Sequence, residues 1–219
     1  MKDLIKDLFR EIPRGASLPR TLVNNRLRDI KVEGKVLDLG AGESQSSYFR
    51  FLQRGKNSKI ISVDIADIKK PTFKIDLEGP LPFKDNDFDY ILCFNLLEHI
   101  FNYAGLIKES YRVLKKEGKL IGSVPFLVNI HPDPNDYFRY SGSTLQRLFQ
   151  KTGFKKIKIE PMGFGPFCVG YSFVGFVFSK IIRLFPFFIT FLADNLLLKI
   201  NKNLGKHKYP LAYYFEAQK

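Results

Sequence analysis

The chain has 219 residues, of which 45% are hydrophobic and 26% are charged. This length and apolar content suit one folded domain with an appendage and exclude a disordered chain. Two cysteines, Cys93 and Cys168, are too few for a disulfide scaffold or a cysteine-based zinc site, and no metal site is expected. The first residues are charged and lack the apolar region of a signal peptide, so we expect a cytoplasmic protein.

The net charge of +13 is distributed unevenly along the chain. Residues 1–100 carry 17 basic and 15 acidic side chains, whereas residues 101–219 carry 18 basic and 7 acidic ones. Nine of the 22 phenylalanines lie between Phe164 and Phe191. The basic second half indicates an anionic partner, although charge alone does not say which one.

In chain order, two short helices are predicted at 2–11 and 18–30, separated by a Pro/Gly interruption. Apolar strands then alternate with helical segments. The predicted strands are 35–41, 59–65, 73–76, 90–96, 119–126, 156–161 and 211–218, and the predicted helices are 46–54, 103–115 and 144–154. This alternation is typical of βαβ crossovers and predicts a doubly wound α/β sheet.

A glycine turn follows the first strand of the predicted sheet. Asp38, Gly40 and Gly42 lie in the stretch VLDLGAG, and Asp64 ends the next strand, 24 residues after Gly40. Glycines at this position let a ligand approach the backbone, and an acid at the end of the next strand can bind ribose hydroxyls. The pattern therefore indicates a nucleoside-containing cofactor.

The charges around this turn distinguish between cofactors. Gln45 replaces the third glycine of the dinucleotide fingerprint, and the carboxylates of Asp38 and Glu43 would repel a pyrophosphate. A cofactor with an ammonium and a sulfonium, and without phosphate, is attracted instead. S-adenosyl-L-methionine (SAM) has these properties.

Several ordered motifs now carry a family resemblance. VLDLGAG, Asp64, the stretch DLEGPLPFKDNDFDYILCFNLLEHI (76–100) and RVLKKEGKLIGSVPF (112–126) resemble class I SAM-dependent methyltransferases. The sequence resembles the broad group of small bacterial methyltransferases with a D…LPF…FD…LEH signature. The resemblance covers about residues 33–161 and the last strand, and it implies a Rossmann-like sheet, SAM as cofactor and methyl transfer.

The resemblance also implies roles for individual residues. The implied cofactor contacts are Asp38, Gly40 and Gly42 at the methionine end, Asp64 at the ribose, Asp76 and the Leu77 backbone at the adenine, and Asn95 beside the sulfonium. Glu98 and His99 of the LEH motif are interpreted as structural hydrogen-bonding groups.

The loop after the fifth strand, within 129–149, is expected at the ligand-binding edge of the sheet. The candidate general bases are His131 and Asp136, and the candidate substrate-binding residues are Arg139 as an anion clamp with Tyr137 and Tyr140 as ring or sugar platforms. An alternative is that Asp136 pairs with Arg139 to hold the loop. Transfer from a sulfonium does not itself require a base, so the catalytic assignment is a hypothesis.

The segment 162–210 separates the last two strands. Pro161–Ser179 contains 19 residues without a charge, but its glycines and Pro166 make a poor transmembrane helix. We expect a hydrophobic helical hairpin, broken near Pro186. It could contact an anionic membrane, cover the active site as a lid, or form a homodimer interface.

These observations divide the chain into N-terminal helices (1–32), a SAM-binding core (33–161), a hydrophobic helical insertion (162–210) and a last core strand (211–219). The predicted function is SAM-dependent O-methylation of a small or lipid-linked hydroxyl compound, such as a saccharide or a prenyl-linked intermediate. The protein is expected in the cytoplasm or peripherally at the inner face of the membrane.

Two other functions remain open at this point. The basic half could bind RNA, although the chain has no tryptophan and no N-P-P-[YFW] motif of the DNA-modifying enzymes. A non-catalytic SAM-binding or membrane scaffold protein is the alternative of another class.

Overall fold

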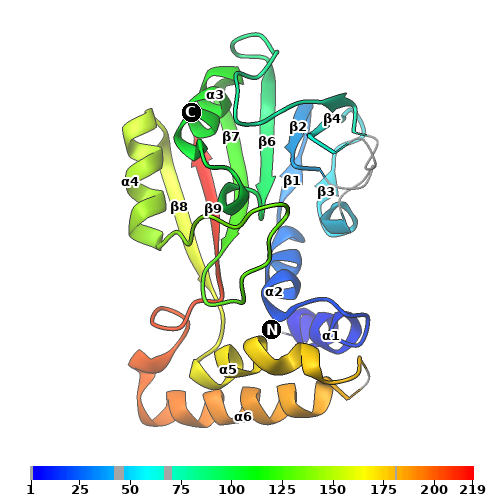
Figure 1. The fold of residues 1–219 in the computed structure, drawn as a ribbon, viewed down its shortest axis with the longest axis vertical. Coiled ribbons are helices and arrows are strands. Elements are labelled where there is room, and N and C mark those ends of the chain that lie inside the picture. Colours follow the sequence, from blue (N-terminus) through cyan, green and yellow to red (C-terminus); the bar gives the residue numbers. More distant parts are fainter. Residues whose placement is uncertain (1, 42–46, 67–70, 181) are drawn as a thin grey trace. The chain divides into compact units, whose positions relative to one another are not determined.

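The structure is a computed structural model that describes residues 2–41, 47–66, 71–180 and 182–219 (Figure 1). The helices are α1 (Lys2–Glu11), α2 (Leu18–Leu27), α3 (Tyr103–Val113), α4 (Gly142–Thr152), α5 (Pro166–Val174) and α6 (Leu184–Ile200), with 3₁₀ turns η1 (Ser47–Arg50), η3 (Leu97–His99), η4 (Gly175–Val177) and η5 (Lys202–Leu204). The strands are β1 (Lys31–Val32), β2 (Lys35–Leu39), β3 (Gln53–Arg54), β4 (Lys59–Asp64), β5 (Phe73–Lys74), β6 (Phe88–Phe94), β7 (Leu114–Pro125), β8 (Lys155–Met162) and β9 (Ala212–Gln218). The predicted α/β fold class is confirmed.

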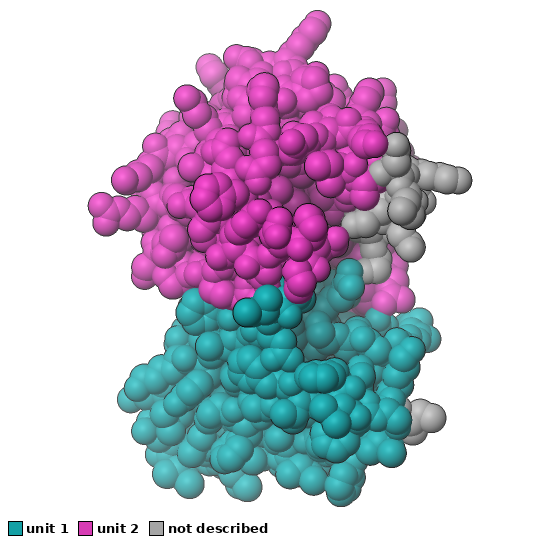
Figure 2. All heavy atoms as spheres, viewed as in Figure 1, with its two compact units in different colours: residues 1–26, 125–131, 161–213 teal, residues 27–124, 132–160, 214–219 magenta. Residues whose placement is uncertain are grey.

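The chain forms two compact units, coloured separately in Figure 2. Unit 1 comprises residues 1–26, 125–131 and 161–213. Unit 2 comprises residues 27–124, 132–160 and 214–219. Each unit is thus assembled from stretches that lie far apart in the sequence.

The main sheet has the strand order β5-β4-β2-β6-β7-β9-β8. The interior strand β2 pairs in parallel with β4 on one side and with β6 on the other. In open parallel sheets, ligands bind at the carboxyl ends of the strands where the order changes direction in this way. The register aligns these ends, because Leu39 lies opposite Val63 of β4 and Cys93 of β6. The loops after β2, β4 and β6 therefore start from one edge of the sheet.

The last strand, β9, lies between β7 and β8. The Lys219 amide donates to the Gly118 carbonyl at 3.0 Å, and the Phe126 amide donates to the Leu211 carbonyl at 2.9 Å. Residue numbers therefore rise along β7 while they fall along β9, and the two strands are antiparallel. Phe215 of β9 is fully buried, and its ring lies 5.0 Å from that of Phe149 in α4.

One predicted element is wrong. Within the described residues, the segment 46–54 is not a helix but η1 followed by the short strand β3, which pairs in parallel with β1. The Gln53 amide donates to the Ile30 carbonyl, and the Gly55 amide donates to the Val32 carbonyl, both at 2.9 Å. This tertiary pairing takes the amides that a helix would have used.

The segment 162–210, in unit 1, contains the two expected helices, α5 and α6, which pack against each other. The helix α6 begins at Leu184, so the break between the two helices ends close to Pro186, as expected. Pro186 occupies the first turn of α6, where its missing amide hydrogen costs no hydrogen bond. Among the described residues, no helix is both long and apolar enough to span a bilayer.

Candidate active site

A pocket of about 260 Å³ lies within unit 2, at the edge where β2, β4 and β6 end. It is lined by Gly40, Asp64, Ile65, Asp76, Leu77, Glu78, Asn95, Leu96, His99, Ile100, Asp133, Pro134, Asn135 and Tyr137. Five of the predicted cofactor residues are among them: Gly40, Asp64, Asp76, Leu77 and Asn95. The tertiary structure thus brings together side chains that are up to 55 positions apart in the sequence.

The turn after β2 requires a glycine. Gly40 has φ = +63°, and a Cβ atom there would come within 2.7 Å of the Leu96 side chain. Its amide donates to the Val63 carbonyl at 2.9 Å, which fixes the turn against β4. The backbone at Gly40 is therefore open to a ligand in a way that any side chain would prevent.

Asn95 leaves β6 in a left-handed conformation, with φ = +49°. Its amide donates to the Ser123 carbonyl at 2.8 Å, and its side-chain oxygen accepts from the Ser123 hydroxyl at 3.0 Å. Asparagine tolerates this backbone geometry better than most residues. These two bonds to β7 hold Asn95 at the pocket wall.

The loop after β5 supplies the carboxylates of Asp76 and Glu78. An oxygen of Asp76 accepts from the Glu78 amide at 2.9 Å. The carboxylate of Glu78 accepts from the amides of Phe101 and Asn102 at 2.7 and 2.8 Å, where α3 begins. Glu78 thus fastens this side of the pocket to the start of α3.

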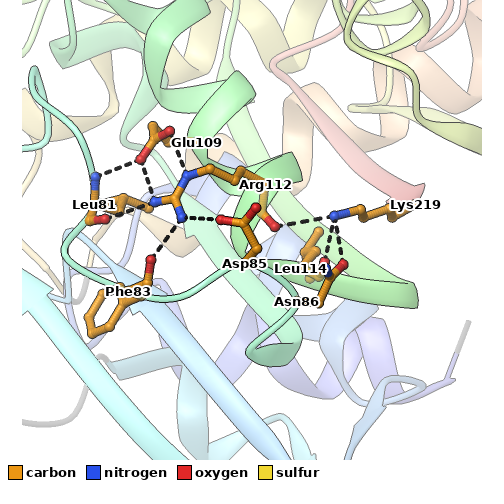
Figure 3. A network of polar contacts seen from close by, with 8 residues as sticks. All are labelled: Leu81, Phe83, Asp85, Asn86, Glu109, Arg112, Leu114 and Lys219. Atoms are coloured by element: carbon orange, nitrogen blue, oxygen red, sulfur yellow. Dashed lines mark hydrogen bonds and ion pairs between the residues drawn. The ribbon is translucent and has the colours of Figure 1, made fainter.

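The remainder of this loop is held by Arg112 of α3 (Figure 3). Its guanidinium donates to the carbonyls of Leu81 and Phe83 at 2.9 and 2.8 Å, and to Asp85 at 2.7 Å. Glu109 binds both the guanidinium and the Leu81 amide, and the bond from Arg112 lowers the pKa of Glu109. The guanidinium of Arg112 therefore holds the backbone of the LPF motif (81–83) against α3.

The lining is acidic in a protein of net charge +13. Four carboxylates contribute to it: Asp64, Asp76, Glu78 and Asp133. Among the described residues that line the pocket, none is lysine or arginine. These carboxylates disfavour a pyrophosphate, which is also negatively charged. They suit a cofactor that carries positive charge and has hydroxyl and amino groups to donate hydrogen bonds. The residues present therefore fit SAM.

Within the described part of the chain, one predicted cofactor residue, Asp38, does not line the pocket. Asp38 is fully buried in β2, and one of its carboxylate oxygens accepts the hydroxyl hydrogen of Tyr48. Gly42 lies outside the described residues. Of the residues predicted at the methionine end, Gly40 lines the pocket, as does Asn95, the residue predicted beside the sulfonium.

His99 is on the pocket wall, which the sequence interpretation as a structural residue did not foresee. Its Nδ1 lies 2.5 Å from the Asn135 carbonyl, and a carbonyl only accepts, so Nδ1 carries a hydrogen. The buried carboxylate of Glu98 lies 3.7 Å from Nε2. The ring is therefore oriented, with Nε2 as the nitrogen that can exchange a proton. The sequence signal that could have placed His99 at the pocket was its position just after the fourth predicted strand, at the ligand-binding edge of the sheet.

The predicted substrate residues have different surroundings. Tyr137 lines the pocket and its side chain is 43% exposed. Asp136, with a side chain that is 1% exposed, is paired with both terminal nitrogens of Arg139, and these hydrogen bonds raise the pKa of Arg139. Tyr140 is buried and donates to the Leu97 carbonyl at 3.0 Å, and burial raises its pKa. Tyr137 alone of these four lines the pocket.

His131 belongs to unit 1, whereas the pocket lies wholly in unit 2. Its side chain is exposed, and its Nδ1 lies 3.1 Å from the Asn129 carbonyl. Its assignment as a general base stays a prediction.

Comparison with known proteins agrees with the geometry of the pocket. A family model described as a methyltransferase domain matches residues 8–159. An uncharacterised protein of Methanocaldococcus jannaschii is 32% identical over 179 residues, which cover 78% of this chain and 74% of that protein. Demethylmenaquinone methyltransferase of Bacillus cereus is 24% identical over 184 residues, covering 64% and 78% of the two chains.

Among solved structures, a SAM-dependent methyltransferase from Archaeoglobus fulgidus superposes with a TM-score of 0.59 at 21% identity. The match covers 97% of this chain and 98% of that one, so the whole fold is shared. The family match supplies the activity that a shared fold alone would not. The chain therefore belongs to the methyltransferase-domain family and is a class I SAM-dependent methyltransferase.

Proposed function

We propose that the protein transfers the methyl group of SAM to a hydroxyl oxygen of a small or lipid-linked molecule. The observation that carries this proposal is the oriented imidazole of His99 on the wall of an acidic pocket. A neutral hydroxyl must lose its proton when it is methylated, and His99 Nε2 can accept it. SAM supplies the electrophilic methyl group, so the protein has to position the acceptor and receive the proton.

His99 is proposed as the proton acceptor because its surroundings support that role. The Asn135 carbonyl fixes the ring orientation, and the buried carboxylate of Glu98 lies 3.7 Å from Nε2. Asp136 is the weaker candidate, since accepting a proton would remove its negative charge and one of the two oxygens that accept from Arg139. Asp64 is proposed to accept from the ribose hydroxyls of SAM and Asp76 from its adenine amino group.

An aromatic edge beside the pocket supports an acceptor with an apolar part. The rings of Phe101 and Tyr137 lie 5.4 Å apart and edge to face, and both side chains are exposed. Phe101 directly follows Ile100 of the pocket lining. The likeness to a demethylmenaquinone methyltransferase supports an amphipathic acceptor as well. A saccharide or a ring joined to a prenyl chain would suit this edge.

We also propose that the protein works in the cytoplasm and binds peripherally to the inner face of the membrane. The many exposed apolar side chains of unit 1 support this location. A lipid-linked acceptor would then be reached from the bilayer surface.

The acceptor class is tested by incubating the protein with methyl-labelled SAM and three extracts: lipids, polar metabolites and RNA. Label in an alkali-stable ether of the lipid or polar fraction is the expected result. Label that appears in RNA alone would contradict the proposal, and label on an amine or a carbon atom would contradict O-methylation.

The base is tested with three matched variants: His99→Gln, His131→Gln and Asp136→Asn. Loss of the proton acceptor should lower kcat by a factor of about 10²–10⁴ while SAM affinity, measured by calorimetry, stays within a few-fold. We expect this pattern for His99→Gln only. The same pattern for His131→Gln, with His99→Gln near wild type, would return the role to the loop histidine.

A further inference from the structure

The outer face of α6, in unit 1, carries a stripe of large apolar side chains that water contacts. Its six members are Phe185, Phe188, Ile189, Leu192, Leu196 and Ile200, and we call them the α6 apolar stripe. Their exposure ranges from 46% at Phe188 to 86% at Ile200. Each of them lies three or four residues from another member, which places all six on one side of a helix. Over 15 residues at ~1.5 Å per residue, the stripe is about 22 Å long.

The stripe is distinct from the face of α6 that packs within unit 1. On that inner face, Phe187 is buried, and its ring lies 5.6 Å from Tyr171 of α5. Phe191 lies on the same face, 5.0 Å from Phe164. The helix is therefore apolar on two sides, and packing within the unit uses one of them.

Other exposed apolar side chains gather in the same part of the chain. Of the 20 large apolar side chains that are exposed in the described residues, 13 lie between Phe167 and Ile200. Soluble monomers rarely expose apolar residues at this density, and such surfaces mark sites of association with a partner or a membrane.

The charges of residues 161–213 indicate which partner fits. This stretch contains six basic residues and a single acidic one, Asp194. Asp194 is 1% exposed and accepts from the amides of Phe167 and Cys168 at 3.0 and 2.9 Å. The exposed charges of the stretch are thus all positive. Lys180 precedes the stripe, and Lys199 and Lys202 stand at its far end.

Arg183 has a different role from these lysines. Its guanidinium donates to the carbonyls of Phe178 and Phe176 at 2.9 and 3.1 Å. These bonds fix the backbone of Phe176 and Phe178, whose rings are exposed to solvent.

We infer that the α6 apolar stripe lies in the plane of an anionic lipid bilayer, with the flanking lysines at the headgroups. Apolar side chains enter the boundary between headgroups and acyl chains, and each nearby lysine gains from the negative surface. If the stripes of two copies faced each other, their lysines would be set against each other, and the stretch 161–213 has no exposed carboxylate to pair them. A nucleic acid would match the lysines but would leave the apolar stripe in water.

This inference assigns the proposed membrane binding to one surface, the α6 apolar stripe. It rests on the proposed function only in the reason for that binding, which is access to a lipid-linked acceptor. Membrane binding itself requires neither SAM nor a methyl acceptor. The two proposals can therefore fail separately: vesicle binding is measured without SAM, and methyl transfer is measured on an acceptor in detergent.

The first experiment is co-sedimentation of the full chain with vesicles of phosphatidylcholine containing 30% phosphatidylglycerol. Binding is expected to these vesicles and to be at least tenfold weaker to pure phosphatidylcholine. The double variant Leu192→Ser/Leu196→Ser should lose binding at least tenfold, and Lys199→Gln/Lys202→Gln should lose it severalfold. Phe73→Ser, which removes an exposed ring from unit 2, is the matched control and should bind like wild type.

The second experiment locates the stripe directly. The chain has no tryptophan, so Leu196→Trp introduces a single reporter into the stripe and Phe73→Trp introduces one elsewhere. On vesicles, the emission of the Leu196→Trp protein should shift to shorter wavelength and be quenched by brominated lipid, while that of Phe73→Trp should not change.

Three outcomes would overturn the inference. Wild-type protein could fail to sediment with anionic vesicles, or the Leu196→Trp emission could remain unquenched while the protein is bound. The protein could also be a dimer that Leu192→Ser/Leu196→Ser converts to a monomer, which would identify a second copy as the occupant. Circular dichroism of every variant separates loss of binding from loss of folding.

Discussion

At Gly40, a single backbone angle shapes the turn of the VLDLGAG motif on the wall of the predicted cofactor pocket. The left-handed φ of +63° costs an L-residue about 1–2 kcal/mol, and an added Cβ would meet Leu96. Neither penalty applies at Gly79, which lies near the pocket but has an ordinary backbone and only a distant carbonyl next to its Cβ position. Gly79 is therefore a suitable control position for an alanine substitution at Gly40.

We predict that Gly40→Ala lowers the free energy of unfolding by about 1–2 kcal/mol and weakens SAM binding at least tenfold. Urea denaturation and titration calorimetry measure the two effects. Gly79→Ala should change either quantity little. Equal SAM affinity for both variants would show that the turn does not contact the cofactor.

The carboxylate of Glu109 makes stability depend on pH. The hydrogen bond from Arg112 is the main cause that holds its pKa below the ordinary value, with partial burial acting in the opposite direction. A carboxylate with a lowered folded-state pKa stabilises the fold above its unfolded pKa of about 4.3, and this stability is lost as the pH falls.

We therefore predict that the urea midpoint falls between about pH 5 and pH 3, and that part of this fall belongs to Glu109. Glu109→Gln should be less stable than wild type at pH 7 and should lose less stability on acidification. The measurement is urea denaturation at intervals from pH 7 to pH 3. Parallel pH profiles for the two proteins would show that the Arg112 network does not produce the effect.

Among the helices, α5 depends on a side chain of its neighbour α6. Its N-cap residue is Gly165, which has no side chain to accept from the first amides, and Asp194 of α6 takes this role for Phe167 and Cys168. A Cβ at Gly165 would approach an Asp194 oxygen to 2.5 Å, so the glycine makes room for the substitute cap.

We predict that Asp194→Ala destabilises the protein by about 2–3 kcal/mol, because the buried amide of Cys168 and the partly buried amide of Phe167 lose their acceptor. Asp194→Asn keeps one acceptor oxygen and should cost less. Asn195→Ala, at the next and exposed position of α6, is the control and should change the free energy of unfolding by about 0.5 kcal/mol or less. Thermal and urea unfolding measure all three.

A stabilising change is expected in the same helix. Gly170 of α5 is exposed, and a Cβ there would find no atom within 4 Å. Alanine loses less backbone entropy than glycine when a helix forms, so Gly170→Ala should raise the free energy of unfolding by about 0.5–1 kcal/mol. A lower urea midpoint would indicate that the helix interior is strained at this position.

Across the whole molecule, the last residues of the chain complete the main sheet. Strand β9 separates β7 from β8, so β8 at the sheet edge has β9 as its neighbour in the described structure. The Lys219 side chain also donates to the carbonyls of Leu114 and Arg112 at 2.8 and 3.2 Å. These bonds join residues more than 100 positions apart, and non-local contacts of this kind slow folding.

We predict that removal of residues 212–219 abolishes cooperative unfolding, because β8 loses its pairing and the Phe149 ring loses its contact with β9. Circular dichroism during thermal unfolding tests this. Lys219→Ala alone should keep a cooperative transition at a lower midpoint. A cooperative transition in the truncated protein would contradict the proposed dependence on β9.

The sequence was sufficient for the sheet and for the cofactor because both depend on local patterns. Apolar runs that end in glycine or aspartate specify where strands stop, and parallel pairing brings those ends to one edge. Gly40, Asp64 and Asn95 follow from that rule. The rule did not predict the short strand within the segment 46–54, because that strand depends on its pairing partner at 31–32 and not on its own sequence pattern.

The polar loop shows why the remaining residues needed tertiary structure. Its side chains are similar in sequence but differ in their partners, which are set by packing with distant residues. The Tyr140 hydroxyl donates to the Leu97 carbonyl, 43 positions away, and the Asn135 carbonyl orients the His99 ring. By itself, the sequence determined the fold class, the cofactor and the basic, phenylalanine-rich second half. Only the tertiary structure decided which loop side chain lines the pocket and which apolar side chains remain on the surface, because burial depends on all the neighbours that folding brings together.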